Sequence, residues 1–233
     1  MHVLKPRPFH HRRFCGQHIS WRSCIAVAKL AETRFRRTGK AAEIGVFLGE
    51  FAGANLKVWQ GEYYAIDAWQ WRPTDDPADK NFKSERQNLK HMQQARRNVA
   101  FAGARAHIMR AKSLEAARQF DDNTFDWLYV DALHTKQALL EDLRAWWPKL
   151  RPGGLFTGDD YGDENSTDFM PAERYAKVYG KFMYDKNVAK KHHWGVMRAT
   201  QQFSSEVGVP LMVTWMRDCY NWPAWWMLKP HWM

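Results

Sequence analysis

The stretch Phe125–Tyr161, FDWLYVDALHTKQALLEDLRAWWPKLRPGGLFTGDDY, decides the fold of this chain. It predicts a strand, a helix, a turn and a second strand, in that order. The helix carries an apolar face at helical spacing, formed by Leu139, Leu143, Trp146, Trp147 and Leu150. The segment 151–154 (RPGG) is expected to end that helix. A strand–helix–strand unit of this length is nearly always a right-handed parallel crossover, so the stretch predicts a parallel sheet.

Both strands of this unit are followed by acidic residues. Asp131 follows the first strand, and Asp159 and Asp160 follow the second. The carboxyl ends of parallel strands meet at one edge of the sheet, where open α/β sheets bind their ligands. Three carboxylates that converge there repel one another unless a cation lies among them, and an all-oxygen ligand set suits Mg²⁺ or Ca²⁺. The alternative is that Asp159 and Asp160 are turn residues that cap the next segment.

Composition restricts the classes to which the chain can belong. Its 233 residues are 45% apolar, which supports one domain with modest additions. No window approaches about 18 uninterrupted apolar residues, so no membrane span is expected. Three scattered cysteines favour reduced thiols and a cytoplasmic location, and the basic N-terminus lacks the apolar run of a secretory signal.

The net charge of +10 is concentrated near the N-terminus. Residues 1–40 hold ten Lys and Arg against the single acid Glu32, which is +9, whereas the rest carries 25 basic and 24 acidic residues. We therefore expect a basic arm and helix in residues 1–40 and one catalytic domain in residues 41–233. The nearly neutral domain has no recognisable RNA-binding module, which disfavours nucleic acid as a partner. The basic arm could still attract RNA electrostatically.

The remaining chain alternates strands and helices until two strands follow each other. Strands are expected over 41–46, 63–67, 106–110, 211–217 and 224–229, and helices over 20–37, 50–60, 82–101, 114–120 and 194–207. This order predicts a doubly wound, Rossmann-like α/β sheet of seven strands, mostly parallel with an antiparallel edge strand and with helices on both faces. Segments 69–80 and 161–193 show the least pattern, and the second is expected to be a lid-like insertion. The last two strands are expected to be joined by a tight turn at 221–223.

A glycine turn follows the first strand of the sheet. Gly45 and Gly49 in the segment 42–49 (AEIGVFLG) would let the backbone approach a ligand, although a helix start that needs a small residue would look the same. Asp67 ends the next strand, 18 residues beyond Gly49, where a carboxylate can accept hydrogen bonds from both ribose hydroxyls. Asp67 could also be an exposed strand end. The loop lacks the Walker lysine and the three-glycine dinucleotide pattern, so a nucleoside without phosphate fits better.

Residues 41–230 resemble a class I S-adenosylmethionine-dependent methyltransferase. Within that class they resemble the metal-dependent O-methyltransferases of the catechol, caffeoyl-CoA and macrolide-sugar types. The resemblance rests on EIGVFLG, YAID, the Lys-Ser pair after the third strand, VDALH, LRPGG and GDDY. It implies a cofactor-binding set with Glu43, Gly45 and Gly49 under the methionine half, Asp67 at the ribose, Ser113 at the adenine, and Asp131 beside them.

The same resemblance implies a metal site of Asp131, Asp159 and Asp160 that holds Mg²⁺ or Mn²⁺. The catechol type has Asn as the third ligand, so Asp160 points toward the sugar-modifying type. His134 lies three residues after Asp131, where the catechol type has Lys and several sugar-type relatives have His. Together with Asp131 it is the predicted catalytic pair. His134 could instead cap the next helix or orient Asp131.

The chemistry implied is an in-line displacement on a sulfonium, for which the protein aligns a nucleophile. A divalent cation lowers the pKa of an acceptor hydroxyl, and His134 can then take the proton. We therefore expect an Mg²⁺-dependent O-methyltransferase whose substrate is a small molecule with a free hydroxyl, such as a sugar, glycan or polyol. The alternatives are an RNA methyltransferase and a relative that binds cofactor without turnover. Trp69 and Trp71 could stack on the acceptor or anchor their loop, and the first helix could pack on a second copy of the chain.

Overall fold

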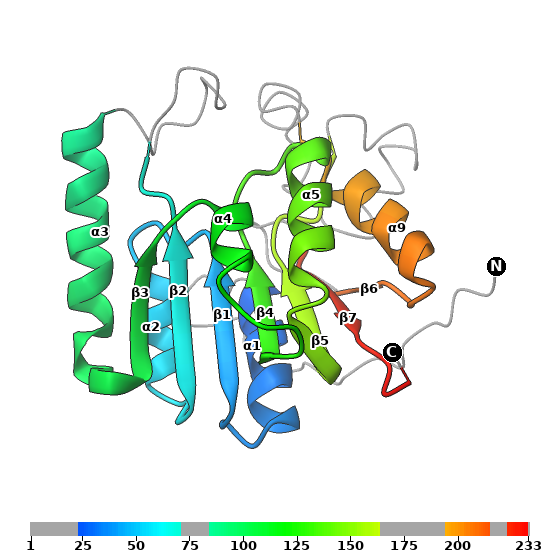
Figure 1. Ribbon diagram of the computed structural model, residues 1–233, viewed down its shortest axis with the longest axis horizontal. Coiled ribbons are helices and arrows are strands. Elements are labelled where there is room, and N and C mark those ends of the chain that lie inside the picture. The colour runs from blue at the N-terminus through cyan, green and yellow to red at the C-terminus, as the bar shows by residue number, and fades with distance from the viewer. Residues whose placement is uncertain (1–22, 71–83, 164–193, 215–222, 233) are drawn as a thin grey trace, which may run out of the picture.

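The computed structural model describes residues 23–70, 84–163, 194–214 and 223–232. One sheet of seven strands in the order β3-β2-β1-β4-β5-β7-β6 forms its centre (Figure 1). The strands are β1 Lys40–Ile44, β2 Glu62–Asp67, β3 Ala106–Arg110, β4 Phe125–Val130, β5 Leu150–Gly158, β6 Met212–Val213 and β7 Trp225–Leu228. The pairs among β1 to β5 are parallel, and β7 is antiparallel to both β5 and β6. The predicted fold class is confirmed, with the antiparallel strand one position in from the edge.

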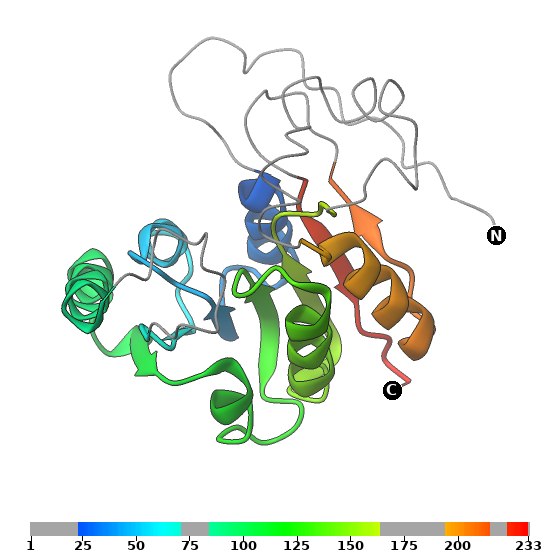
Figure 2. The same cartoon turned by 90° about the horizontal axis from the view of Figure 1, so that it is seen from above.

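Helices cover both faces of this sheet. They are α1 Ser23–Arg34, α2 Glu50–Leu56, α3 Glu85–Val99, α4 Ser113–Ala117, α5 Lys136–Trp146 and α9 Val196–Val207, with the 3-10 helix η1 Ala100–Arg105 directly after α3. Viewed from above, α1, α2 and α3 lie on one side of the sheet and α4, α5 and α9 on the other (Figure 2). Within the described ranges, no helix has both the length and the apolar content to cross a lipid bilayer.

Two apolar cores fill the space between these layers. One joins the sheet to α4, α5 and α9 and includes Phe125, Trp146 and Phe203. The other joins the sheet to α1, α2 and α3 and includes Trp59 and Trp127. Every residue of β4 is buried, as expected for a central parallel strand covered on both faces.

The turn between α5 and β5 lies earlier in the chain than the sequence predicts. α5 ends at Trp146, and β5 begins at Leu150. Helical spacing places Leu150 on the apolar face of the helix, but it pairs with Phe125 of β4 in the sheet. The segment 151–154 lies inside β5 and does not end the helix, so that prediction is wrong.

Backbone geometry explains why this segment belongs to a strand. The Gly153 N–H donates to the Lys229 carbonyl at 2.8 Å, and the Lys229 N–H donates to the Gly154 carbonyl at 2.9 Å. Gly153 has φ 78°, a left-handed conformation, and the register between β4 and β5 shifts between Phe125 and Trp127. The glycines therefore allow an irregular start to β5, which is a known use of glycine in strands.

Other boundaries differ by a few residues. Helix α9 begins two residues later than expected, because Trp194 and Gly195 form isolated bridges with Thr135 and Asp163. The expected strand 211–217 is described only as far as Thr214, and its regular part is two residues long. Most of the basic arm, nearly all of the 161–193 insertion and most of the 221–223 turn fall outside the described residues.

Two buried polar side chains join the central strands. The Trp127 indole N–H donates to the Thr157 hydroxyl at 2.9 Å, and that hydroxyl donates to the Leu128 carbonyl at 2.8 Å. Trp127 is 1% exposed and Thr157 is fully buried. Any change that removes the hydroxyl therefore leaves a buried indole N–H without an acceptor.

We expect Thr157→Val to lower the free energy of unfolding by about 1–3 kcal/mol, the usual cost of an unsatisfied buried donor. Urea denaturation measures the change, and Thr157→Ser, which keeps the hydroxyl, is the matched control. Trp127→Phe combined with Thr157→Val should cost less than the sum of the two single changes, because no orphaned donor remains. Strict additivity in this cycle would contradict the interpretation.

Candidate functional site

The ends of four parallel strands bring most of the predicted site residues to one edge of the sheet. Gly45 follows β1, Asp67 ends β2, Asp131 follows β4 and Asp160 lies two residues after β5. The Gly45 N–H donates to the Ile66 carbonyl at 2.9 Å, which holds the first two strand ends together. The structure thus collects residues that are up to 115 positions apart in sequence, from 45 to 160.

Both glycines of the first loop are required by the packing of the protein itself. Gly45 has φ 92°, and a Cβ atom there would lie 2.0 Å from the Asp131 carbonyl oxygen. Gly49 has φ 73°, and a Cβ atom there would lie 2.9 Å from Ala95 Cα on α3. The loop therefore needs glycine at these two positions with or without a bound ligand.

Between the two glycines, Phe47 also adopts a left-handed backbone, with φ 51°. Its ring packs edge-on against His91 of α3, with centroids 4.7 Å apart. The Trp69 indole N–H donates to the Phe47 carbonyl at 2.8 Å, and Trp69 is fully buried. Trp69 thus anchors its loop and does not present a stacking surface, whereas Trp71 lies outside the described residues.

Asp67 connects the loops that follow β1 and β2. Its Oδ2 accepts hydrogen bonds from the Val46 and Phe47 N–H groups, both at 2.9 Å, and its Oδ1 accepts one from the Trp69 N–H at 2.7 Å. Burial raises the pKa of Asp67, while the three backbone donors act in the opposite direction. A carboxylate has about four lone-pair positions, so limited capacity remains for a ligand hydroxyl.

Glu43 lies inside the protein on β1 and is 2% exposed. The Tyr63 hydroxyl donates to Glu43 Oε2 at 2.7 Å, and the Asn55 amide donates to that hydroxyl at 3.0 Å. Burial raises the pKa of Glu43 well above its usual value, against the effect of the Tyr63 bond and with help from the nearby Asp131 and Asp67 charges. The contacts of its side chain are with other residues of the protein interior. The structure therefore places Glu43 beneath the Gly45–Gly49 loop and not on the loop surface that was predicted to meet the cofactor.

Ser113 opens α4 and directs its hydroxyl toward α5. It accepts a hydrogen bond from the Trp146 indole N–H at 2.8 Å and also hydrogen-bonds the Asp142 carboxyl. These two partners use most of the capacity of one hydroxyl. The predicted adenine contact at Ser113 therefore depends mainly on its backbone.

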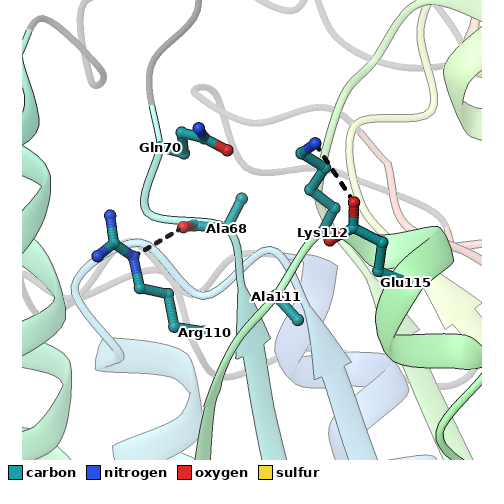
Figure 3. Close-up of a pocket in the computed structure, with 6 residues that line it drawn as sticks. All are labelled: Ala68, Gln70, Arg110, Ala111, Lys112 and Glu115. Atoms are coloured by element: carbon teal, nitrogen blue, oxygen red, sulfur yellow. Dashed lines mark hydrogen bonds and ion pairs between the residues drawn. The ribbon is translucent and has the colours of Figure 1, made fainter.

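A cavity of about 270 Å³ opens beside this position, between the ends of β2 and β3. It is lined by Ala68, Gln70, Arg110, Ala111, Lys112 and Glu115 (Figure 3). Arg110 donates to the Ala68 and Trp69 carbonyls and pairs with Glu85 at 2.5 Å, and Lys112 pairs with Glu115 at 3.3 Å. Both cations are therefore already paired, so the cavity suits an uncharged polar group better than a phosphate.

A cluster of three side chains lies at the ends of β4 and β5. The ligand atoms of Asp131, His134 and Asp160 all lie within 4.8 Å of one another. His134 Nε2 is 3.2 Å from Asp131 Oδ1 and 3.3 Å from Asp160 Oδ2. The three side chains are 24% to 35% exposed, so a small molecule can reach them.

The charges of this cluster shift the pKa of His134. Burial alone would lower that pKa, but the hydrogen bond to Asp131 and the charges of Asp160, Asp131 and Asp159 raise it to about 9. An imidazolium at this position neutralises part of the carboxylate charge. A divalent cation would meet the same electrostatic requirement.

Asp159 does not share the surroundings of the other two aspartates. It is 8% exposed and lies outside the cluster. Burial raises its pKa well above the usual value, as do the charges of Asp160 and Asp131, while a hydrogen bond from Tyr129 acts in the opposite direction. The structure thus brings together two of the three predicted acids with His134.

The backbone around the cluster is fixed by residues that the sequence analysis missed. The Gly195 N–H donates to the His134 carbonyl at 2.8 Å, and the Trp194 ring lies 5.4 Å from the His134 ring. Asp163 is fully buried and pairs with Arg198 of α9 at 2.9 Å. Asp163 carried a detectable signal, because it is a further acid directly after the fifth strand.

Comparisons with known proteins agree with the fold of this chain. A family model described as a methyltransferase domain matches residues 42–161, slightly more than half of the chain. Among solved structures, a protein from Methanococcus maripaludis described as an S-adenosyl-L-methionine-dependent methyltransferase superposes with a TM-score of 0.51 at 17% identity, over 89% of this chain and 85% of its own. A protein from Nostoc punctiforme that is described as an O-methyltransferase superposes with a TM-score of 0.58 at 15% identity. The match covers 88% of this chain and 55% of that protein. A protein from Galdieria sulphuraria that is described as a sarcosine dimethylglycine methyltransferase superposes with a TM-score of 0.55 at 11% identity, over 89% of this chain and 86% of its own. No curated protein matches the sequence.

Asp142, which supports Ser113, is expected to make stability depend on pH. It is 5% exposed, and burial raises its pKa from 3.8 to about 7 despite the Ser113 bond. The folded state therefore binds more protons than the unfolded state between these two values, and stability falls as the pH rises through that window.

Asp142→Asn removes this titration while keeping a group that can hydrogen-bond Ser113. We expect the variant to melt several degrees above the wild type at pH 8 and to show a much smaller gain at pH 4.5, near the lower end of that window, as measured by thermal denaturation across pH. Asp122→Asn, at an exposed acid paired with Lys149, is the control and should show no such trend. A pH-independent difference between the Asp142→Asn protein and the wild type would refute the assignment.

Proposed function

Because this chain belongs to the methyltransferase-domain family and has the fold of S-adenosylmethionine-dependent methyltransferases, we propose that it methylates a hydroxyl oxygen with the help of a divalent cation. The observation that carries the proposal is the cluster of Asp131, His134 and Asp160 at the same sheet edge as Gly45 and Asp67. Methyl transfer to oxygen needs an acceptor oriented beside the donor and a route for its proton. The cluster offers groups for both tasks.

The residues near β1, β2 and β3 fit the cofactor. S-adenosylmethionine supplies an activated methyl group when bound. The Gly45–Gly49 loop brings the backbone close to the strand ends, and Asp67 lies at the end of β2, where its remaining capacity suits one ribose hydroxyl. The adjacent cavity, with its paired cations, suits the neutral adenine.

The residues near β4 and β5 fit a divalent metal ion. Asp131 and Asp160 would hold Mg²⁺ or Mn²⁺, which favour carboxylate oxygens, and Asp159 would support them from its buried position. Such an ion lowers the pKa of an acceptor hydroxyl. A cation bound by the carboxylates would offset the charges that raise the pKa of His134, so that its ring could lose its proton and serve as the base. Its Nε2 reaches both carboxylates, and the Gly195 N–H donates to its backbone carbonyl.

The surroundings of the cluster support a small hydroxylated acceptor. Leu133 precedes His134 in the chain and is 43% exposed, and the Trp194 ring lies 5.4 Å from the His134 ring. Both could contact the apolar face of a sugar or polyol while its hydroxyls meet the charged cluster. The acceptor class, a cytoplasmic location and assembly into a homo-oligomer are parts of this proposal.

Cofactor binding tests the first half of the proposal. We expect S-adenosylhomocysteine to bind with micromolar affinity in calorimetry, and Asp67→Ala to weaken binding at least about tenfold, since charge-assisted hydrogen bonds contribute roughly 1.5–3 kcal/mol each. Asp126→Ala is the matched control, because Asp126 is an equally buried acid at the opposite end of β4. It should lose stability but keep its affinity. If the folded protein gave no heat with S-adenosylmethionine or with S-adenosylhomocysteine, the proposed cofactor would be excluded.

Metal dependence tests the second half. Methyl transfer to a panel of sugars and polyols should stop with EDTA and return with Mg²⁺ or Mn²⁺. Asp160→Asn should weaken Mn²⁺ binding, measured by electron paramagnetic resonance of the free ion, and leave S-adenosylhomocysteine binding unchanged. His134→Ala should keep both ligands and lower kcat by about 10²–10⁴, the usual contribution of a positioned base.

Two results would overturn these assignments. Full activity after exhaustive chelation would remove the metal from the mechanism. A His134→Ala enzyme with the wild-type rate between pH 6 and 9 would show that His134 is not the base.

A further inference from the structure

The outward side of α3 is strongly basic, although the domain as a whole is nearly neutral. Residues 84–118 contain eight Lys and Arg against two acids, Glu85 and Glu115. Glu85 pairs with Arg110 at 2.5 Å, and Glu115 pairs with Lys112 at 3.3 Å. The two acids are therefore already neutralised, and the remaining cations of this region keep their charge.

Packing decides which side of α3 carries these charges. The inner side buries Asn88, His91, Ala95 and Val99 against the rest of the domain. The exposed side carries four cations: Arg86, Lys90, Arg96 and Arg97. They extend over 12 residues, and the 11 steps from Arg86 to Arg97 span roughly 16 Å of helix at about 1.5 Å per residue.

Among the residues that the structure describes, few partners compete for these four cations. Arg97 donates to the neutral Gln94 amide at 3.0 Å. Within the described parts of the chain, no carboxylate pairs with Arg86, Lys90 or Arg96. A ligand with several negative charges would therefore displace only water and counterions.

An exposed aromatic residue follows the end of α3. Phe101 lies on η1, directly after α3, and is 56% exposed. Leu89, midway along the exposed side, is 36% exposed. A soluble partner with only charged groups would leave this ring uncovered, whereas a nucleobase can stack on it.

We propose that this α3 surface, formed by Arg86, Lys90, Arg96, Arg97 and Phe101, binds single-stranded nucleic acid. The cations contact successive phosphates, and Phe101 stacks on a base. Nucleic acid fits better than an acidic protein, because its charges repeat along a line and its bases supply flat rings next to them. Glu85 at the start of α3 pairs with Arg110 at the end of β3. A nucleic acid bound along α3 would therefore lead to the edge of the sheet where the parallel strands end (Figure 1). The inference does not depend on which acceptor the enzyme methylates.

Fluorescence anisotropy with a labelled 12-nucleotide single-stranded RNA tests the surface, with the full chain and a salt titration. We expect Arg86→Gln, Lys90→Gln and Arg96→Gln together to make the slope of log K against log salt shallower by about 2, since each phosphate contact in a single strand contributes about 0.7. Phe101→Ala should weaken binding about fivefold or more without changing the slope, because stacking does not depend on salt.

A matched triple variant, Arg36→Gln, Arg37→Gln and Lys40→Gln, removes the same charge from the α1–β1 connection and the first residue of β1, and should change the slope by less than 1. Circular dichroism melts confirm that every variant is folded. An equal effect of both triple variants would mean that only net charge matters, and would overturn the proposal. Binding of polyglutamate as tight as that of RNA, with no effect of Phe101→Ala, would instead identify an acidic protein as the partner.

Discussion

The carboxylate of Asp67 holds together the loops that follow β1 and β2, at the edge of the sheet where the candidate site lies. It accepts hydrogen bonds from Val46 and Phe47 on one loop and from Trp69 on the next. Phe47 and Trp69 both have positive φ, 51° and 38°, which costs roughly 1–3 kcal/mol for each residue. Bonds to a charged acceptor contribute about 1.5–3 kcal/mol each, so three of them are sufficient to hold both strained residues. The shape of the loop between Gly45 and Gly49 thus follows from one buried charge.

The architecture could be predicted from sequence because its signals are local and redundant. The β4–α5–β5 crossover combines an apolar run, an amphipathic helix and acids directly after each strand, and these agree with one another. Leu150 shows where this reasoning fails. An apolar residue four positions after Trp146 fits the end of a helix and the start of a buried strand equally well, and only pairing with Phe125 decides between them.

The sequence predicted the location of the candidate site in the fold more accurately than it predicted which side chains face that site. Strand topology accounts for the meeting of Asp131 with the acids after β5. Asp160 has a left-handed backbone, with φ 53°, which its sequence does not reveal, so the different surroundings of Asp159 and Asp160 could not be predicted. Glu43 and Ser113 lie at the predicted strand and helix ends, yet their side chains bond to Tyr63, Trp146 and Asp142. Such partners come from other parts of the chain and leave no pattern near the residue itself.

The net charge of the domain does not describe how its charges are distributed. Outside residues 84–118, residues 41–233 carry 17 basic and 22 acidic side chains, so a neutral total conceals two regions of opposite sign. The position of a helix in the fold, rather than the sum over the domain, determines what a partner would encounter. A charge total taken over a whole domain does not show how the charges are distributed among its surfaces.

The bridge between Asp163 and Gly195 has a consequence for how such a protein can change over evolution. These two residues stand on either side of segment 164–193, and their pairing holds the two points where that segment leaves and rejoins the domain. Because closure at this point is maintained by the domain itself, each doubling of the intervening length costs only about 0.6 kcal/mol. The segment can therefore be lengthened, shortened or replaced while β5, α9 and the cluster beside them keep their places. Variation in the length or sequence of that segment therefore need not disturb the fold, although the segment leaves and rejoins the domain next to the backbone of His134.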